Sequence, residues 1–154
     1  FLVFGAAIVI SYLLTTYSKW NMRKLAIWID AIGLLTTVFL PDSLDPIAGL
    51  YPIFFCAAFQ WGTYCGAEGY NSASIFITNN YKQLLLAWTR YFIEKDRKLL
   101  AKAVLYSMTV ISFFAGACIG CFSVYSWGKY GAFVCLIPLA AARLLLWAGE
   151  KGSF

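Results

Sequence analysis

Five long hydrophobic runs organise the chain. Each run is almost continuously apolar, which favours helices over strands, and about 20 apolar residues in a helix cross the hydrocarbon core of a bilayer. The sequence therefore predicts an all-α membrane protein, a polytopic helical bundle in a single domain over residues 1–154. Its five expected spanning helices lie at about residues 1–18, 25–40, 46–67, 103–127 and 130–149.

The composition agrees with a lipid environment. Of the 154 residues, 62% are hydrophobic and 12% are charged, whereas soluble domains are about 45–50% apolar and about 25% charged. A soluble chain of this size could not bury so much apolar surface. A water-soluble enzyme, a disordered chain and a nucleic-acid-binding module are therefore disfavoured. The expected partners are membrane lipids and no nucleic acid.

The basic residues orient the predicted helices. Eleven of the 12 Lys and Arg residues lie on alternate connections or at the C-terminal end, and Lys129 is alone on the opposite side. Basic connections face the cytoplasm in multipass proteins, so we expect a plasma-membrane protein with a cytoplasmic C-terminus. The first run then enters from outside, so we expect residue 1 to be a truncated start and the full protein to have six helices.

The connection at about residues 79–102 is amphipathic and basic. Tyr81, Trp88 and Phe92 recur at helical spacing, and Asn79 or Asn80 could cap a helix that begins there. This pattern predicts an interfacial helix on the cytoplasmic side. The alternative is the cytoplasmic end of a long helix that packs on its neighbours.

Two charged residues lie inside predicted spans. Asp30 is six residues past Lys24, which in a helix is about 9 Å. An acid at that place either forms a site for a cation or proton or pairs with Lys or Arg near the interface. Arg143 either extends its side chain to the headgroups or pairs, or it recognises an anionic ligand.

A polar, glycine-containing interruption follows the third run. Such breaks are tolerated at membrane depth where they line a cavity, and they bind substrates in transporters. A loop outside the membrane is the alternative. With Asp30, the candidate substrate-binding residues are Gln60, Asn71, Thr78 and Asn79. The candidate helix-packing residues are the GxxxG pairs Gly62 with Gly66 and Gly116 with Gly120.

No catalytic constellation is visible. The chain has no His, and its five cysteines lie in apolar runs. We therefore expect no enzymatic activity, no cofactor and no metal site.

The run FQWGTYCGAEGYNSASIFITNNYKQL, with the basic stretch and two helices after it, resembles the YoaK-like family, small bacterial multipass proteins with a DUF1275-type domain of unknown function. The resemblance covers about residues 50–149. The matched positions are Gln60, Gly66, Gly69, Thr78 and Asn79, with departures at Trp61 and Asn79 from the commoner family pattern. It implies a first half with a helix that is absent here, and two three-helix halves would make a 3+3 inverted repeat.

Three functions compete. The first is a small-solute transporter or exporter with a site at the broken helix, residues 60–80; its substrate is not named by the sequence. The second is a non-transporting interaction or scaffold subunit that forms a homodimer or binds a membrane-protein partner. The third, an enzyme acting on lipid, ranks last because no acid–base or metal set is present.

Overall fold

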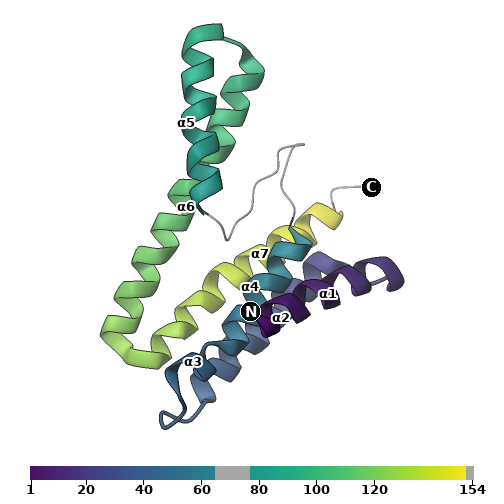
Figure 1. The fold of residues 1–154 in the computed structure, drawn as a ribbon, viewed down its shortest axis with the longest axis vertical. Coiled ribbons are helices and arrows are strands. Elements are labelled where there is room, and N and C mark those ends of the chain that lie inside the picture. The colour runs from purple at the N-terminus through teal and green to yellow at the C-terminus, as the bar shows by residue number, and fades with distance from the viewer. Residues whose placement is uncertain (65–76, 152–154) are drawn as a thin grey trace. The chain divides into compact units, whose positions relative to one another are not determined.

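The structure is a computed structural model that describes residues 1–64 and 77–151 (Figure 1). No strand occurs in these two ranges, which confirms the predicted all-α fold. The helices in chain order are α1 (Leu2–Tyr17), α2 (Met22–Phe39), α3 (Pro46–Gly49), α4 (Tyr51–Thr63), α5 (Ile77–Glu94), α6 (Arg97–Trp127), the 3-10 helix η1 (Gly128–Cys135) and α7 (Leu136–Lys151).

Two compact units divide the chain. The first contains Phe1–Thr63 together with Gly120–Phe154, and the second contains Tyr64–Ile119. Helix α6 begins in the second unit and ends in the first. The single domain expected over residues 1–154 stays a prediction.

Helix α4 is central to the first unit. It packs against both α1 and α2, and α2 also packs against η1 and α7. Cys56, Ala58 and Phe59 are the buried residues of α4. Phe59 is the largest fully buried side chain among the described residues. The core of this unit therefore lies along α4. Its other buried residues include short side chains such as Ala7 of α1 and Ala26 of α2.

Small residues let α4 approach its neighbours closely. A Cβ atom at Gly62 would overlap the hydroxyl of Ser11 in α1 and lie 3.1 Å from the Ser11 Cβ. A Cβ atom at Gly33 in α2 would overlap the thiol of Cys56 and lie 3.4 Å from the Pro52 carbonyl oxygen. Close contact through small residues is how helices associate in membranes, where apolar burial between helices supplies little driving force.

The second unit contains a helical hairpin of α5 and the first part of α6. The two helices are joined by Lys95 and Asp96. The Asp96 carboxylate begins α6 by accepting the backbone N–H of Lys98 at 2.9 Å. Across the hairpin, the indole N–H of Trp88 donates to the hydroxyl of Ser107 at 3.0 Å. The two helices are therefore antiparallel neighbours, with Trp88 at the level of Ser107.

Lys95 has a left-handed backbone, with φ of 53°. Its N–H donates to the Tyr91 carbonyl oxygen at 2.8 Å and so closes the last turn of α5. Glycine is the residue that normally fills this position at the end of a helix.

We expect Lys95→Gly to raise the free energy of unfolding by about 0.5–1 kcal/mol, because glycine removes the Cβ strain. Thermal unfolding in detergent measures this. Arg90→Gly, in the regular part of α5, should lower the stability, and equal losses in both variants would contradict the assignment.

Helix boundaries differ from the sequence expectations in four places, one of which is the run at 130–149, where η1 precedes α7 and α7 begins at Leu136. The run at 46–67 is divided into α3 and α4, because Pro52 has no N–H to continue the ladder. Helix α5 begins at Ile77, so Asn79 and Asn80 lie in its first turn and do not cap it, which makes the predicted cap wrong. Helix α6 begins at Arg97, six residues before the uncharged run, because Asp96 caps it.

One helical stretch of the described residues is both long and apolar enough to cross a membrane. It covers Arg97–Lys151 and includes a segment with mean hydropathy 1.9, of which 6% is buried. Helix α1 is apolar but shorter. Helix α2 carries Arg23, Lys24 and Asp30, and α4 has only 13 residues. Membrane association thus rests on one clear segment, and five spanning helices stay a prediction.

Candidate functional site

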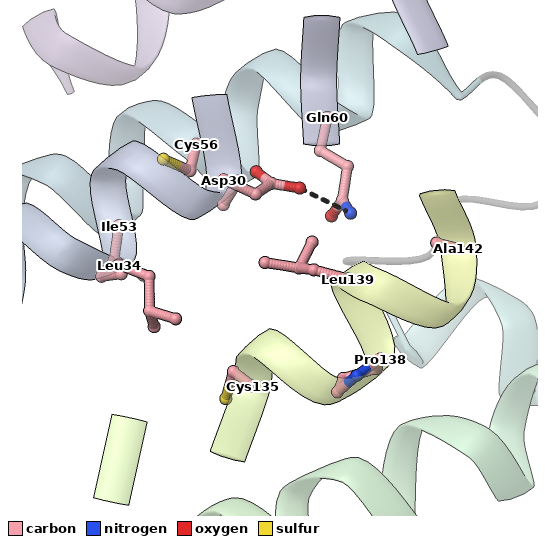
Figure 2. Close-up of a pocket in the computed structure, with 10 residues that line it drawn as sticks. Asp30, Leu34, Ile53, Cys56, Gln60, Cys135, Pro138, Leu139 and Ala142 are labelled. Atoms are coloured by element: carbon pink, nitrogen blue, oxygen red, sulfur yellow. Dashed lines mark hydrogen bonds between the residues drawn. The ribbon is translucent and has the colours of Figure 1, made fainter. Parts of the chain in front are cut away.

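A cavity of about 410 Å³ lies in the first unit, lined by residues of α2, α4, η1 and α7 (Figure 2). Its walls are mostly apolar, and its polar side chains come from α2 and α4. The lining residues are Asp30, Leu34, Ile53, Cys56, Ala57, Gln60, Cys135, Pro138, Leu139 and Ala142. A mainly apolar cavity with a few polar groups is typical of small-molecule sites.

Asp30 and Gln60 form the polar part of the cavity. The side-chain amide of Gln60 donates to Oδ2 of Asp30 at 3.3 Å, and Figure 2 shows the two side chains pointing toward one another. Both residues were predicted from the sequence as candidate binding residues, and α4 packing on α2 brings them together across 30 positions of the chain. No described residue donates to the side-chain carbonyl oxygen of Gln60, which can therefore accept a hydrogen bond from a ligand.

Asp30 has no cationic partner within 4.0 Å among the described residues. The alternative that it pairs with Lys or Arg therefore finds no support in this part of the chain. A carboxylate in an apolar setting costs free energy unless it is paired or hydrogen-bonded. The Gln60 amide supplies one hydrogen bond, so the carboxylate can still bind a positively charged group.

Cys56 fixes the contact beside this pair. Its thiol lies 3.3 Å from the backbone carbonyl oxygen of Ile29, to which it donates. Its sulfur also occupies the space that a side chain at position 33 would need. The cavity wall next to Asp30 is therefore held by close contact between α2 and α4.

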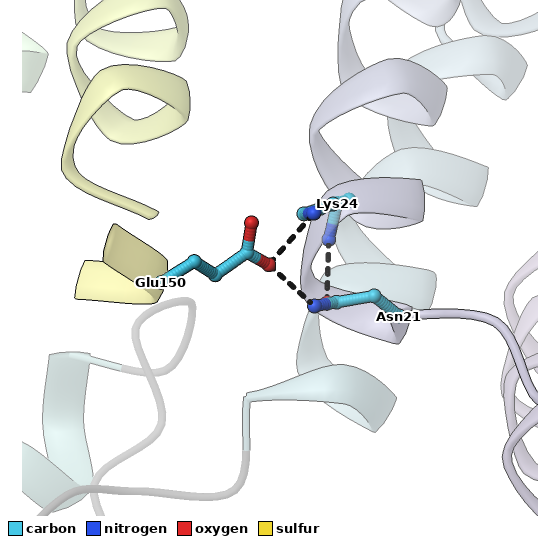
Figure 3. Close-up of polar contacts among 3 residues, drawn as sticks. All are labelled: Asn21, Lys24 and Glu150. Atoms are coloured by element: carbon cyan, nitrogen blue, oxygen red, sulfur yellow. Dashed lines mark hydrogen bonds and ion pairs between the residues drawn. The ribbon is translucent and has the colours of Figure 1, made fainter. Parts of the chain in front are cut away.

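Two ion pairs connect the two ends of α2 to α7 and to η1. Near the start of α2, Lys24 lies 2.7 Å from the carboxylate of Glu150, which also accepts the Asn21 amide at 3.3 Å (Figure 3). Beyond the end of α2, Asp42 lies 2.7 Å from Lys129, at the start of η1, which leads into α7. The two helices are therefore antiparallel, and the cavity lies between the two ion pairs along their length.

Charge reversal at Lys24 and Glu150 tests this antiparallel arrangement. We expect Lys24→Glu and Glu150→Lys each to lower the unfolding free energy by about 0.5–1 kcal/mol, because both groups are partly exposed. The double variant should recover most of that loss. Thermal unfolding of the wild-type protein, the two single variants and the double variant gives the coupling free energy between the two residues. Additive losses of stability in the double variant would contradict direct pairing.

Arg143 is the second charged residue expected inside a span. It is partly buried, and its Nη1 atom is buried without a hydrogen-bond partner among the described residues. The antiparallel ion pairs place its turn of α7 at about the level of Asp30. The two alternatives for Arg143, namely extension to the headgroups or pairing, and recognition of an anionic ligand, stay predictions.

Thr78 and Asn79 are not among the described residues that line the cavity. Thr78 and Asn79 are exposed in the first turn of α5, in the second unit. Asn71 and Gly66 lie outside the described residues. At Gly116 and Gly120 a Cβ atom would meet nothing within 4 Å among the described atoms. Their predicted packing role stays a prediction, whereas Gly62 lies against Ser11.

The sequence did not predict the side of the cavity that η1 and α7 form. Cys135, Pro138, Leu139 and Ala142 follow a spacing of three, four and seven residues, which puts them on one helical face. That spacing was available as a signal, but in an apolar run nothing distinguishes a cavity face from a lipid face. The described residues hold no group of three or more His, Cys, Asp or Glu side chains placed for a metal.

Comparisons with known proteins agree with the sequence resemblance and extend it. The family model described as Protein of unknown function (DUF1275) matches residues 1–146. The match therefore begins at residue 1, and the expectation that the resemblance covers only about residues 50–149 was too narrow. No curated protein and no solved structure matches the chain. Because the family model covers nearly all of its length, the chain belongs to the DUF1275 family, whose function is unknown.

Proposed function

We propose that the chain is part of a multipass protein of the bacterial plasma membrane that transports a small organic cation. The observation that carries this proposal is the cavity at Asp30, where a carboxylate with no cationic partner in the described chain faces apolar walls. Charged groups inside membrane segments are costly and usually mark a substrate or ion pathway. The family membership adds no activity of its own.

The ion pairs at the ends of α2 support a membrane placement for this helix. Its 18 residues extend about 27 Å, close to the hydrocarbon thickness of about 30 Å. Lys24 with Glu150 and Asp42 with Lys129 then lie at opposite headgroup regions. The excess of basic residues on the Lys24 side supports a cytoplasmic position for that end and for the C-terminus.

The chemistry of the cavity indicates the kind of solute. A cationic centre would lie against the Asp30 carboxylate, and an N–H group on the solute could donate to the Gln60 carbonyl. Leu34, Ile53 and Leu139 would contact an apolar body. Organic ammonium ions with short alkyl or aryl groups have both features.

Uptake into proteoliposomes tests the proposal. Quaternary ammonium ions are suitable probes because their fixed charge keeps them from crossing lipid unaided. Tetramethylammonium, tetraethylammonium and benzyltrimethylammonium are offered at a range of concentrations, with protein-free liposomes as the control. We expect saturable uptake of at least one probe. Uptake of all three at the protein-free rate would contradict the proposal.

A non-transporting interaction protein is the second candidate. The observation that favours it is the open space at Gly116 and Gly120, beside the exposed side chain of Phe113. Glycines four residues apart allow a second helix to approach closely. A co-purifying protein that is lost in Gly116→Leu, combined with absent uptake, would favour this function over transport.

A further inference from the structure

Asp30 is the only acidic side chain among the described residues that line the cavity. The Gln60 amide donates to its Oδ2 atom at 3.3 Å. No described residue donates to its Oδ1 atom. One oxygen of the carboxylate is therefore open to whatever enters the cavity.

The elements packed against α2 bring no second charge to the cavity. These elements are α4, η1 and α7. Helix α4 contributes the Gln60 amide and the Cys56 thiol, η1 contributes the Cys135 thiol, and the described lining residues of α7 are apolar. The chain has no histidine. The carboxyl group of Asp30 is therefore the acid–base group of the described cavity, apart from the two thiols.

The charged residues at the ends of these elements are paired with one another. Lys24 pairs with Glu150, and Asp42 pairs with Lys129, each at 2.7 Å. Arg143 of α7 does not line the cavity and forms no ion pair within 4.0 Å among the described residues. An arginine side chain does not release its proton in proteins. None of these groups therefore replaces the cavity carboxylate as a proton carrier.

The apolar walls make an uncompensated charge costly in either state of the site. Without a cation, an ionised Asp30 faces Leu34, Ile53 and Leu139, and a buried carboxylate avoids this cost by taking up a proton. With the proton in place the acid is neutral, so a cation in the same cavity would lack its counter-charge. The site therefore holds one proton or one cation, and not both.

Gln60 can form a hydrogen bond with Asp30 in both of these states. Its N–H donates to the carboxylate in the structure (Figure 2). After rotation of the amide, its carbonyl oxygen can accept from the O–H of the protonated acid. A partner with both a donor and an acceptor leaves no unsatisfied polar group when the proton leaves or returns. Glutamine at this place suits a carboxyl group that changes its protonation state.

We propose that the protein exchanges protons for organic cations, one for one, at Asp30. This inference rests on the proposed function and adds what drives it. The entering cation displaces the carboxyl proton, which passes to water on the side from which the cation came. When the cation leaves on the other side, a proton from the water there returns to the carboxylate. One positive charge moves in each direction, so exchange of a monovalent cation transfers no net charge.

Two driving forces, imposed separately on proteoliposomes of the wild-type protein, distinguish exchange from permeation of the cation alone. A proton gradient runs from about pH 5.5 inside to about pH 7.5 outside, below the reference pKa of about 8.5 for thiols. Valinomycin with equal potassium on both sides holds the potential at zero. Valinomycin with a potassium gradient, at equal pH, gives a negative interior instead. Uptake of tetraethylammonium is the readout.

We expect the proton gradient to accelerate the initial uptake several-fold and the potential alone to leave it unchanged. Saturable uptake that responds to the potential and not to the proton gradient would overturn the exchange and leave the proposed function standing. Uptake at the protein-free rate under both conditions would overturn both.

A matched pair of variants assigns the exchange to the cavity. Asp30→Asn should lose the response to the proton gradient. Asp45→Asn should keep it, because Asp45 is an exposed residue that caps α3 and asparagine caps a helix equally well. Loss of the response in both variants, or in neither, would overturn the assignment to Asp30.

Proton release on binding gives a second readout that needs no membrane and no variant. In weakly buffered detergent solution, tetraethylammonium should release up to one proton per bound cation from the wild-type protein. Its apparent affinity should fall as the pH is lowered, because protons compete for the same carboxylate. Binding of tetraethylammonium without proton release at every pH between about 5 and 8 would overturn the inference.

Discussion

Asp30→Asn should reduce the saturable uptake of quaternary ammonium ions at least about tenfold, because a hydrogen bond or contact to a charged group is worth about 1.5–3 kcal/mol. Asparagine has nearly the same shape, so the cavity and the contact with Gln60 can persist. The loss should therefore be in binding and transport, with little change in thermal stability. Initial uptake rates over a range of concentrations measure it.

Two further variants sharpen this result. Gln60→Ala removes the neutral amide that holds Asp30 and leaves the carboxylate, and a quaternary ammonium ion has no N–H for the Gln60 carbonyl to accept, so we expect a smaller loss than in Asp30→Asn. Glu94→Gln removes a negative charge from the exposed end of α5 and should have no effect. Equal uptake by the wild-type protein and Asp30→Asn would exclude the carboxylate from the site.

Gly33→Val should lower the unfolding temperature by several degrees. The new side chain would overlap the buried Cys56 thiol and approach the Pro52 carbonyl, which is backbone and cannot rotate away. Overpacking of this kind costs about 1–3 kcal/mol, and each 1 kcal/mol shifts the midpoint by about 2–4 °C in chains of this size. Gly62→Val should have a similar effect through Ser11 of α1.

Two glycines that do not lie at a helix crossing provide the control for these variants. At Gly5 of α1 and Gly116 of α6 a Cβ atom meets nothing within 4 Å among the described atoms. Gly5→Val and Gly116→Val should therefore leave the unfolding temperature unchanged or raise it, since glycine is a poor helix former. A uniform fall in all four variants would mean that glycine itself, and not the helix crossings, determines the effect.

The helices could be predicted from the sequence because their signal is local. Uncharged runs gave helices near the observed α1, α2, α6 and α7, with ends that differ by a few residues. The ends of α5 and α6 were less predictable. They depend on Asp96 as a cap and on the packing of Asn80, neither of which is visible in hydrophobicity.

Asp30 could be identified alone but not its partner. A carboxylate within an apolar run is easily noticed in a sequence, and it calls for an explanation because its removal from water costs free energy. The contact with Gln60 depends on how α4 crosses α2, and that crossing depends on where Gly33 and Cys56 meet. Thr78 and Asn79 belong to a polar break whose position in space the sequence could not give, and the structure places them in the other unit.

The central claim is that Asp30 is a cavity carboxylate that binds an organic cation. Modification of the wild-type protein in nanodiscs by dicyclohexylcarbodiimide, which reacts with carboxyl groups in apolar sites, tests this most directly when read by mass spectrometry of the Asp30 peptide. We expect an adduct at Asp30 that forms more slowly with rising benzyltrimethylammonium, while its neutral carbon analogue gives no protection. An unmodified Asp30, or an adduct whose rate is unaffected by tetramethylammonium, tetraethylammonium and benzyltrimethylammonium, would contradict the claim.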